Sequence, residues 1–181
     1  MRVITGSAKG RKLESLPGLE TRPTAEVVKE AVFSMVQFEI EGSNILDLFA
    51  GSGQMGVEAL SRGARYCVFV DNSRACAVVQ RQNLAHTKLT DKARVVTSDA
   101  VSYLRGTSGP FDIAFIDPPY LKGYAVKLLP LVADIMSEGG VILYESDRKE
   151  ELPEDAGRFS KVKEYHYGKT KITMYRITQG E

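Results

Sequence analysis

The chain has 181 residues, of which 43% are apolar and 26% charged, and its formal net charge is +1. A chain of this length most simply folds as one domain with its own hydrophobic core. No stretch of ~20 mostly apolar residues is present, which excludes a transmembrane helix, and the first residues lack the apolar block of a signal peptide. We therefore expect a cytoplasmic protein that does not contact a membrane.

The two cysteines, Cys67 and Cys76, lie in apolar segments, and the sequence contains no CxxC motif and no Cys/His cluster. This pattern is typical of reduced core thiols rather than of a disulfide or a metal site. No metal site is predicted. His86 and His166 have no evident partner in the sequence and are expected at the surface.

Residues 1–23 contain several glycines and prolines, which predict a hairpin or an arm. The first 13 residues hold four basic side chains and no acidic one: Arg2, Lys9, Arg11 and Lys12. A second basic cluster lies within residues 158–176, where Glu164 dilutes it. Such patches are compatible with contact to phosphate, although a solvated surface explains them as well.

From residue 24 onward, the spacing of apolar residues predicts alternating helices and strands. A helix over 24–38, with Thr24 as its N-cap, precedes strands at 44–49, 66–71, 93–99, 111–117 and 140–146. Helices are expected between them at 54–62, 73–86, 100–105 and 123–136, the last with a kink or break at Pro130. Two final strands within 159–177, joined through Tyr167, Gly168 and Lys169, should form an antiparallel hairpin on the sheet edge.

The predicted fold is therefore α/β and Rossmann-like, because alternating strands and helices imply a parallel sheet covered on both faces. The sheet is mostly parallel and seven-stranded, and it ends in the antiparallel C-terminal hairpin. A single domain over 24–181 is preceded by a small basic extension over 1–23.

A glycine-rich motif, "DLFAGSGQMG", stands between the first of these strands and the next helix. Gly51, Gly53 and Gly56 allow a tight turn and a close approach to a ligand that faces the helix N-terminus. Asp71 ends the next strand, where a carboxylate can accept both hydroxyls of a ribose. The motif predicts a ligand that carries a nucleoside, and a dinucleotide would use the same geometry.

The position of Asp47 favours S-adenosylmethionine over a dinucleotide. It lies on the strand just before the glycine loop, where its charge would repel a pyrophosphate and would suit a ligand with a cationic group, such as S-adenosylmethionine. A carboxylate that caps loop N–H groups is the alternative. Asp99 either accepts a hydrogen bond from an adenine amine or caps the following helix. Together with Asp71 and Asp117, these acids end four successive strands, where open parallel sheets bind ligands.

The segment "FDIAFIDPPYLKG" adds a second motif, in which two prolines end a strand directly after an acid. With "DLFAGSG" and "DPPY", the chain resembles class I S-adenosylmethionine-dependent methyltransferases. It resembles most closely the RsmD family of bacterial 16S ribosomal RNA guanine-N2 methyltransferases, through "RPTAEVVKEAVFSM", "LDLFAGSGQMGVEALSRGA" and "FIDPPY". The basic start and the closing "YGKTKITMYR" also resemble that family, so the similarity covers nearly the whole chain.

The resemblance implies that S-adenosylmethionine, which becomes S-adenosylhomocysteine, methylates a guanine N2 amine in 16S rRNA, within a partly or fully assembled small ribosomal subunit. A monomer is expected. The implied cofactor contacts are Arg22, Thr24, Asp47, Phe49, Gly51, Gly53, Asp71, Asn72, Asp99, Ala100 and Asp117. The implied catalytic residues are Asp117, Pro118, Pro119 and Tyr120, and the implied RNA contacts are Arg2, Lys9, Arg11 and Lys12.

These roles are chemically reasonable, because an exocyclic amine on a base is a poor nucleophile whose lone pair must be aimed at the methyl group. Asp117 and the Pro118 carbonyl can each accept an amine hydrogen, which positions the lone pair. Tyr120 can stack on a base that has been turned out of its helix or loop.

Two positions depart from the family pattern. Asp71, followed by Asn72, stands where many members have glutamate, and Gln54-Met55 replaces a small apolar pair. Three alternative functions remain at this point: adenine N6 methylation of DNA or RNA, a nicotinamide-dependent oxidoreductase, and an RNA-binding module without catalysis.

Overall fold

The computed structural model describes residues 1–18 and 23–178 of the chain. Its helices are α1 (Pro23–Met35), α2 (Gln54–Ser61), α3 (Arg74–Thr87), the 3-10 helix η1 (Thr90–Lys92), α4 (Ala100–Gly106) and α5 (Tyr124–Ala133). Its strands are β1 (Asn44–Leu48), β2 (Tyr66–Asp71), β3 (Ala93–Thr97), β4 (Phe111–Ile116), β5 (Met136–Asp147), β6 (Asp155–Ala156), β7 (Phe159–Tyr167) and β8 (Thr170–Arg176).

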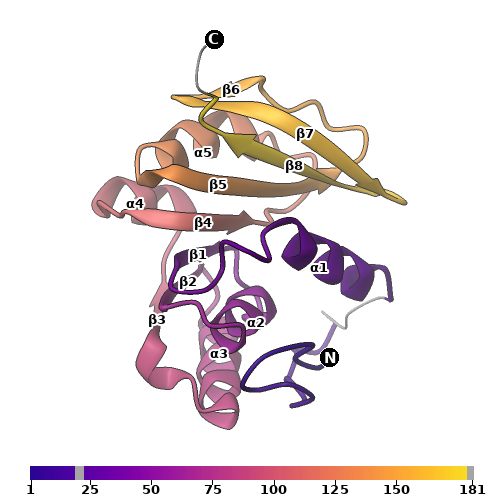
Figure 1. Cartoon of the computed structure of the whole chain (residues 1–181), viewed down its shortest axis with the longest axis vertical. Coiled ribbons are helices and arrows are strands. Elements are labelled where there is room, and N and C mark those ends of the chain that lie inside the picture. The colour runs from indigo at the N-terminus through magenta and orange to yellow at the C-terminus, as the bar shows by residue number, and fades with distance from the viewer. Residues whose placement is uncertain (19–22, 179–181) are drawn as a thin grey trace.

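One mixed sheet runs through the molecule in the order β3-β2-β1-β4-β5-β8-β7-β6 (Figure 1). Strands β1 to β5 pair in parallel, whereas β8 runs antiparallel to both β5 and β7. The predicted α/β fold with an antiparallel C-terminal hairpin is confirmed. The sheet has eight strands rather than seven, because the two-residue β6 pairs with the outer edge of β7.

Helices α1 and α5 differ most from the predictions, since α1 ends at Met35 rather than at residue 38 and α5 at Ala133 rather than at residue 136. Helix α1 begins at Pro23, so Thr24 is its second residue and not its N-cap, in keeping with the preference for proline at the first helical position. Helix α5 continues past Pro130 and ends at Ala133, so no break occurs at the proline. The carbonyl that loses its hydrogen bond there belongs to Val126, which is exposed to solvent and can bond water instead.

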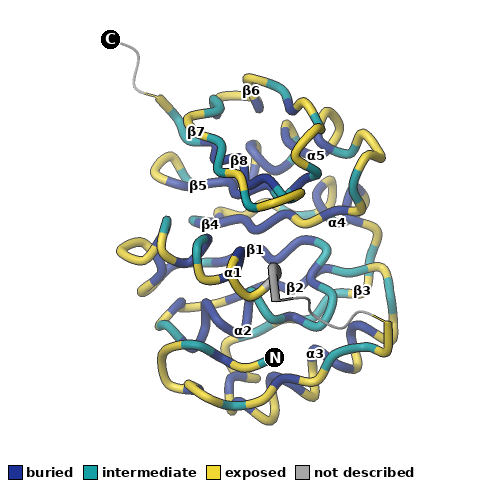
Figure 2. The backbone as a smooth tube through the Cα atoms, turned by 90° about the vertical axis from the view of Figure 1, so that its right-hand side faces the viewer, coloured by how far each residue is buried: buried dark blue, intermediate teal, exposed yellow. Residues whose placement is uncertain are grey.

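Each face of the sheet carries its own helical layer. Alternate residues of the strands point to opposite faces, so Ile45 and Ile113 pack with α1, α2 and α3, while Leu46 and Ala114 pack with α4 and α5. The central strands are accordingly buried and the outer loops exposed (Figure 2). Among the described residues, no helix is long and apolar enough to cross a membrane.

The N-terminal segment turns back on itself as a small hairpin, with an isolated antiparallel bridge between Arg2 and Lys12. Its apolar residues Val3, Ala8 and Leu13 are buried in the same core as α2 and α3. Gly6 has a φ of +92°, and a Cβ at this position would lie 1.8 Å from the Ser61 carbonyl oxygen. The hairpin therefore packs against α2 too closely for any side chain at Gly6.

A buried carboxylate fastens the hairpin to two helices. Glu58 of α2 accepts hydrogen bonds from the backbone N–H of Ile4 at 2.8 Å and of Thr5 at 3.0 Å. It also forms ion pairs with Lys29 of α1 at 3.1 Å and with Arg62 at 2.9 Å. Because a buried charge is tolerated only when it is paired and hydrogen-bonded, this cluster holds the hairpin, α1 and α2 in one arrangement.

The cysteines and histidines lie in the environments predicted for them. Cys67 and Cys76 are free and buried, as predicted, and burial raises the pKa of both thiols. His86 and His166 are exposed, as predicted.

Candidate cofactor and substrate site

The carboxyl ends of β1, β4 and β5 open into a cavity of about 100 Å³ beneath α1. Its polar wall is formed by Lys29, Asp47, Gln54, Asp117 and Glu145, and the rest is mostly apolar. The apolar lining consists of Val28, Val32, Phe49, Ala50, Met55, Phe115, Ile116, Leu143 and Ile172. These residues come from six elements, α1, α2, β1, β4, β5 and β8, because the parallel strands β1, β4 and β5 bring their carboxyl ends to one edge of the sheet and the other three elements pack against it.

The glycine loop adopts backbone conformations that ordinary residues rarely occupy. Gly51 and Gly53 have φ values of +54° and +82°, and even Phe49 has a φ of +62°. A phenylalanine in this conformation costs of order 1–3 kcal/mol, and such residues concentrate at ligand sites. The Phe49 ring packs edge-on against Tyr124, with 5.5 Å between ring centroids, so the strained turn is held by side-chain contact.

Side chains from β2 and α3 support the loop from behind. Asp71 accepts hydrogen bonds from the backbone N–H groups of Gly51 and Ser73, both at 2.9 Å. Gln80 donates to the Gly51 carbonyl at 2.8 Å and Asn83 to the Ser52 carbonyl at 2.9 Å. Asp71, which was predicted to bind ribose, therefore holds the glycine loop in place. This gives a structural function to an aspartate at a position where many family members have the longer glutamate.

Asp47 is 3% exposed and accepts a hydrogen bond from the backbone N–H of Gly56 at 2.9 Å. The pKa of its carboxyl is raised to about 7, mainly by burial. The Gly56 hydrogen bond lowers this pKa, and the charge of the nearby Asp71 raises it. The hydrogen-bonded cap that the sequence left as an alternative is therefore present. The Gly56 N–H does not neutralise the negative charge of the Asp47 carboxylate, so a cationic ligand group in the cavity would be favoured.

The four strand-end acids do not all line the cavity. Asp47 and Asp117 do, while Asp71 supports the loop. Asp99 caps α4 by accepting from the backbone N–H of Ser102 at 2.9 Å, and this hydrogen bond lowers the pKa of its carboxyl. Further along this edge of the sheet, Asn72 is exposed and Ala100 is buried.

Asp117, the first residue of the "DPPY" corner, lines the cavity together with Asp47. Pro118 is buried and Pro119 exposed, so the rigid turn is anchored on one side. The Tyr120 hydroxyl donates to Glu145 and lies 3.4 Å from the Thr170 hydroxyl. Burial and the charge of Glu145 raise the pKa of the Tyr120 hydroxyl, so it stays protonated as a donor.

Two acids at this wall interact with each other. Asp117 keeps contact with solvent at the rim, yet the protein around its carboxyl and the neighbouring Glu145 raise its pKa. Burial likewise raises the pKa of Glu145, against the effect of the Tyr120 hydrogen bond. Glu145 was not predicted as a site residue. The signal that would have found it is its place in "GVILYES", an acid near the end of the fifth strand, as Asp117 is of the fourth.

Lys29, Gln54 and Met55 also line the cavity without having been predicted to. The Gln54-Met55 pair, which departs from the family pattern, lies at the start of α2 and lines the cavity. Arg22 lies outside the described residues, and the side chain of Thr24 is likewise not described, so neither can be placed relative to the cavity.

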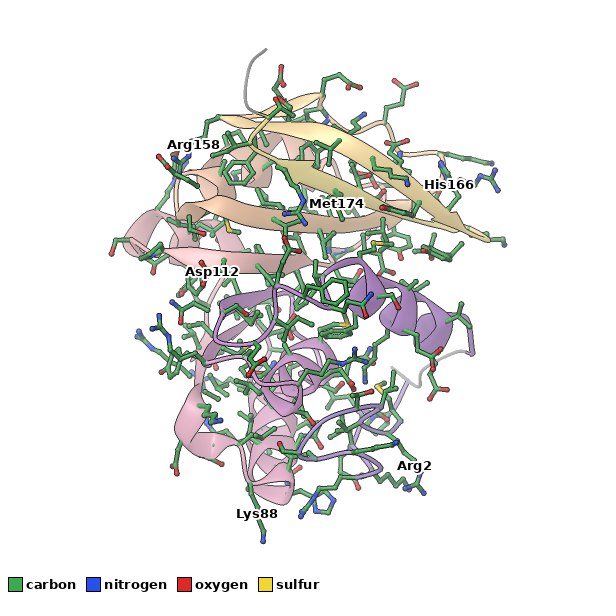
Figure 3. All side chains as sticks on the ribbon, in the orientation of Figure 1. Arg2, Lys88, Asp112, Arg158, His166 and Met174 are labelled. Carbon is green, nitrogen blue, oxygen red and sulfur yellow. The ribbon has the colours of Figure 1, made fainter. Side chains whose placement is uncertain are left out.

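The predicted RNA contacts lie on the N-terminal hairpin, away from the second basic cluster. Arg2, Lys9 and Lys12 are exposed, and Arg11 donates to the His86 carbonyl. Figure 3 places Arg2 and Arg158 at opposite ends of the long axis of the molecule. The second cluster is largely occupied by ion pairs: Arg158–Glu138, Lys161–Glu154, Lys171–Glu164 and Arg176–Glu39.

Comparison with known proteins gives matches over nearly the whole chain. The family model described as "Conserved hypothetical protein 95" matches residues 1–176. A Bacillus subtilis protein named as a candidate rRNA methyltransferase, YlbH, is 40% identical over 181 residues, which cover 97% of this chain and 98% of the relative. Ribosomal RNA small subunit methyltransferase D of Escherichia coli K12 is 36% identical, covering 100% of this chain and 92% of the relative.

A solved structure agrees with these matches. The Escherichia coli protein yhhF, titled as a candidate methyltransferase, superposes with a TM-score of 0.88 at 33% identity, covering 98% of this chain and 99% of its own. The similarity therefore includes the N-terminal hairpin and the C-terminal strands as well as the parallel sheet.

Proposed function

Because this chain belongs to the RsmD family of bacterial ribosomal RNA methyltransferases, we propose that it methylates the N2 amine of a guanine in 16S rRNA. The observation that carries the proposal is that Asp117 of "DPPY" lines the same cavity as Asp47 and as Phe49 and Ala50 of the glycine loop. An amine acceptor and a cofactor loop thus share one site.

The residues that line the cavity suit part of S-adenosylmethionine, which when bound would supply an electrophilic methyl group on a cationic sulfur. A buried carboxylate at Asp47, with a pKa raised by burial, suits the cationic end of that molecule. Gly51 has open space where a side chain would stand, which leaves the backbone open to close approach, and Phe49 of the same loop lines the cavity. Asp71, Asn72, Asp99 and Ala100 would hold the nucleoside end along the neighbouring strand ends.

Asp117 and the Pro118 carbonyl would hold the two hydrogens of the base amine, and so keep the nitrogen lone pair directed into the cavity. The raised pKa of Asp117 also makes its carboxylate a suitable acceptor for the proton that the nitrogen loses once it carries the methyl group. Pro118 and Pro119 limit movement of these acceptors. Tyr120, fixed through its hydroxyl, would present its ring to the base for stacking, worth ~1–3 kcal/mol.

The exposed lysines and arginine of the N-terminal hairpin would contact RNA phosphates beside this site. With so few free basic residues, the chain would not read a long RNA alone, so the proposed substrate is rRNA within a partly or fully assembled small ribosomal subunit. We further propose that the protein acts as a monomer in the cytoplasm.

The test offers methyl-labelled cofactor and the protein to small subunits that lack their modifications, and then digests the RNA to nucleosides. Label in N2-methylguanosine is expected, and label in N6-methyladenosine would refute the proposal. Asp117→Ala should lose methyl transfer by at least a hundredfold while still binding S-adenosylhomocysteine in calorimetry. Binding of NAD by the wild-type protein would favour the oxidoreductase instead.

A further inference from the structure

Two carboxyl groups stand side by side at the end of the sheet. The parallel register pairs Ile116 of β4 with Tyr144 of β5, so Asp117 and Glu145 are the next residues along these two strands. Phe115 and its partner Leu143, two residues earlier, line the cavity, and Asp117 and Glu145 line it too. Adjacent strands lie ~4.8 Å apart, so two flexible carboxylate side chains on the same face can converge on one base.

Glu145 is held in place by the "DPPY" corner itself. The Tyr120 hydroxyl donates to one of its oxygens, and Thr170 of β8 lies 3.4 Å from the same hydroxyl. A carboxylate has about four acceptor positions, so one tyrosine hydroxyl leaves acceptor capacity toward the cavity. The side chain is thus a fixed acceptor beside the acceptor that would hold the base amine.

The edge of guanine offers two adjacent donors, the N1–H and the N2 amine. Adenine and 2-aminopurine instead have an N1 that accepts hydrogen bonds, and two acceptors facing each other are unfavourable. Building on the proposed function, we propose that Glu145 determines specificity by accepting the guanine N1–H while Asp117 accepts the N2 amine. A site built to hydrogen-bond one group rejects analogues that lack it far better than an apolar pocket can.

A role limited to orienting Tyr120 would predict a different outcome. In that case the loss of the Tyr120 hydroxyl and the loss of the Glu145 charge would impair all bases equally. A role in reading N1–H acts on the choice between bases, and it persists when the tyrosine hydroxyl is removed. The ratio of rates on two bases therefore separates the two roles.

The target position is first located by finding which fragment of the methylated 16S rRNA carries the label, and the experiment then uses small subunits rebuilt with 16S rRNA that has either guanine or 2-aminopurine at that position. Both bases have the 2-amine, and only guanine has N1–H. The wild-type protein should methylate guanine at least a hundredfold faster, measured as kcat/KM. In Glu145→Gln, whose amide can accept or donate, this ratio should fall at least tenfold. In the matched control Tyr120→Phe, the ratio should stay within threefold of wild type even if both rates fall.

Three results are decisive against the inference. Equal wild-type rates on the two bases would overturn it without any variant being needed. An unchanged ratio in Glu145→Gln, with S-adenosylhomocysteine binding intact in calorimetry, would reduce Glu145 to a positioning residue for Tyr120. Absence of any methylated guanine with the wild-type protein would refute the proposed function, and this inference with it, whereas the first two results leave that function standing.

Discussion

Substitution of Asp47 tests most directly whether a buried carboxylate with a raised pKa makes the cavity suitable for a cation. In Asp47→Asn the amide oxygen can still accept the Gly56 hydrogen bond, so the change removes the charge and little else. Burial raises the pKa of the Asp47 carboxyl from its ordinary 3.8 to about 7. The folded protein therefore keeps a proton on Asp47 at pH values where the unfolded chain has already lost it.

The consequence for stability follows from proton linkage. Where the folded state binds more protons than the unfolded state, the free energy of unfolding falls as pH rises. This loss begins near pH 4 and ends near pH 7, the two values between which the carboxyl titrates. Each unit of pKa difference corresponds to ~1.4 kcal/mol, so the wild-type protein should lose roughly 3 kcal/mol relative to Asp47→Asn between pH 5 and pH 8.

Urea unfolding of both proteins at pH 5 and pH 8 measures this quantity, because all other titrating groups are common to the pair. If the stability difference between the two proteins is the same at both pH values, Asp47 does not carry an elevated pKa and the reasoning is wrong.

Cofactor binding offers a second measurement of the same group. At pH 6 a cationic ligand beside Asp47 should displace up to about one proton, which calorimetry detects as a dependence of the binding heat on the ionisation enthalpy of the buffer. Asp47→Asn should show no such dependence and should bind S-adenosylhomocysteine about ten- to a hundredfold more weakly, the effect of losing a hydrogen bond to a charged group.

Three further predictions concern packing, the buried ion pairs and RNA contact. Gly56→Ala should lower the free energy of unfolding by ~1–3 kcal/mol in urea titrations, because the added Cβ would lie 2.3 Å from the Phe69 ring. Lys29→Met should lower the free energy of unfolding by ~3–5 kcal/mol, since Glu58 would lose its buried cationic partner and keep only the partly exposed Arg62. Lys9→Ala should reduce the slope of log affinity for RNA against log salt concentration by ~0.7–0.9 if it contacts a phosphate.

Matched controls separate these effects from general damage. Gly42→Ala and Glu30→Gln change exposed residues, and Glu30→Gln should alter stability by less than ~0.5 kcal/mol. Gly42 has a φ of +74° with open space around it, whereas Gly56 is crowded without a positive φ, so Gly42→Ala tests backbone strain without crowding and Gly56→Ala tests crowding without that strain. Wild-type stability in Gly56→Ala would show that Phe69 can move aside. Wild-type stability in Lys29→Met would show that Arg62 and the hairpin N–H groups suffice for Glu58.

The sequence alone determined the order of elements and the side of the sheet on which the site lies. Apolar periodicity and turn residues are local properties, so strand β2 and the C-terminal hairpin were predicted to within a residue or two. In a parallel sheet all carboxyl ends lie at one edge, so Asp47 and Asp117 were correctly expected at one cavity, whereas Asp71 and Asp99 do not line it. The "DPPY" motif needed no three-dimensional information to be recognised.

Only the tertiary structure decided which of these residues act together. The Tyr120–Glu145 and Asp71–Gly51 hydrogen bonds join residues 25 and 20 positions apart. The ion pair between Arg176 and Glu39, which neutralises part of the second basic cluster, spans 137 positions. Such pairings depend on the register between strands and on which helix covers which face, and neither is encoded in the local pattern of any one segment. For this reason the sequence predicted an acid at the end of the fourth strand, and only the folded sheet revealed a second acid beside it.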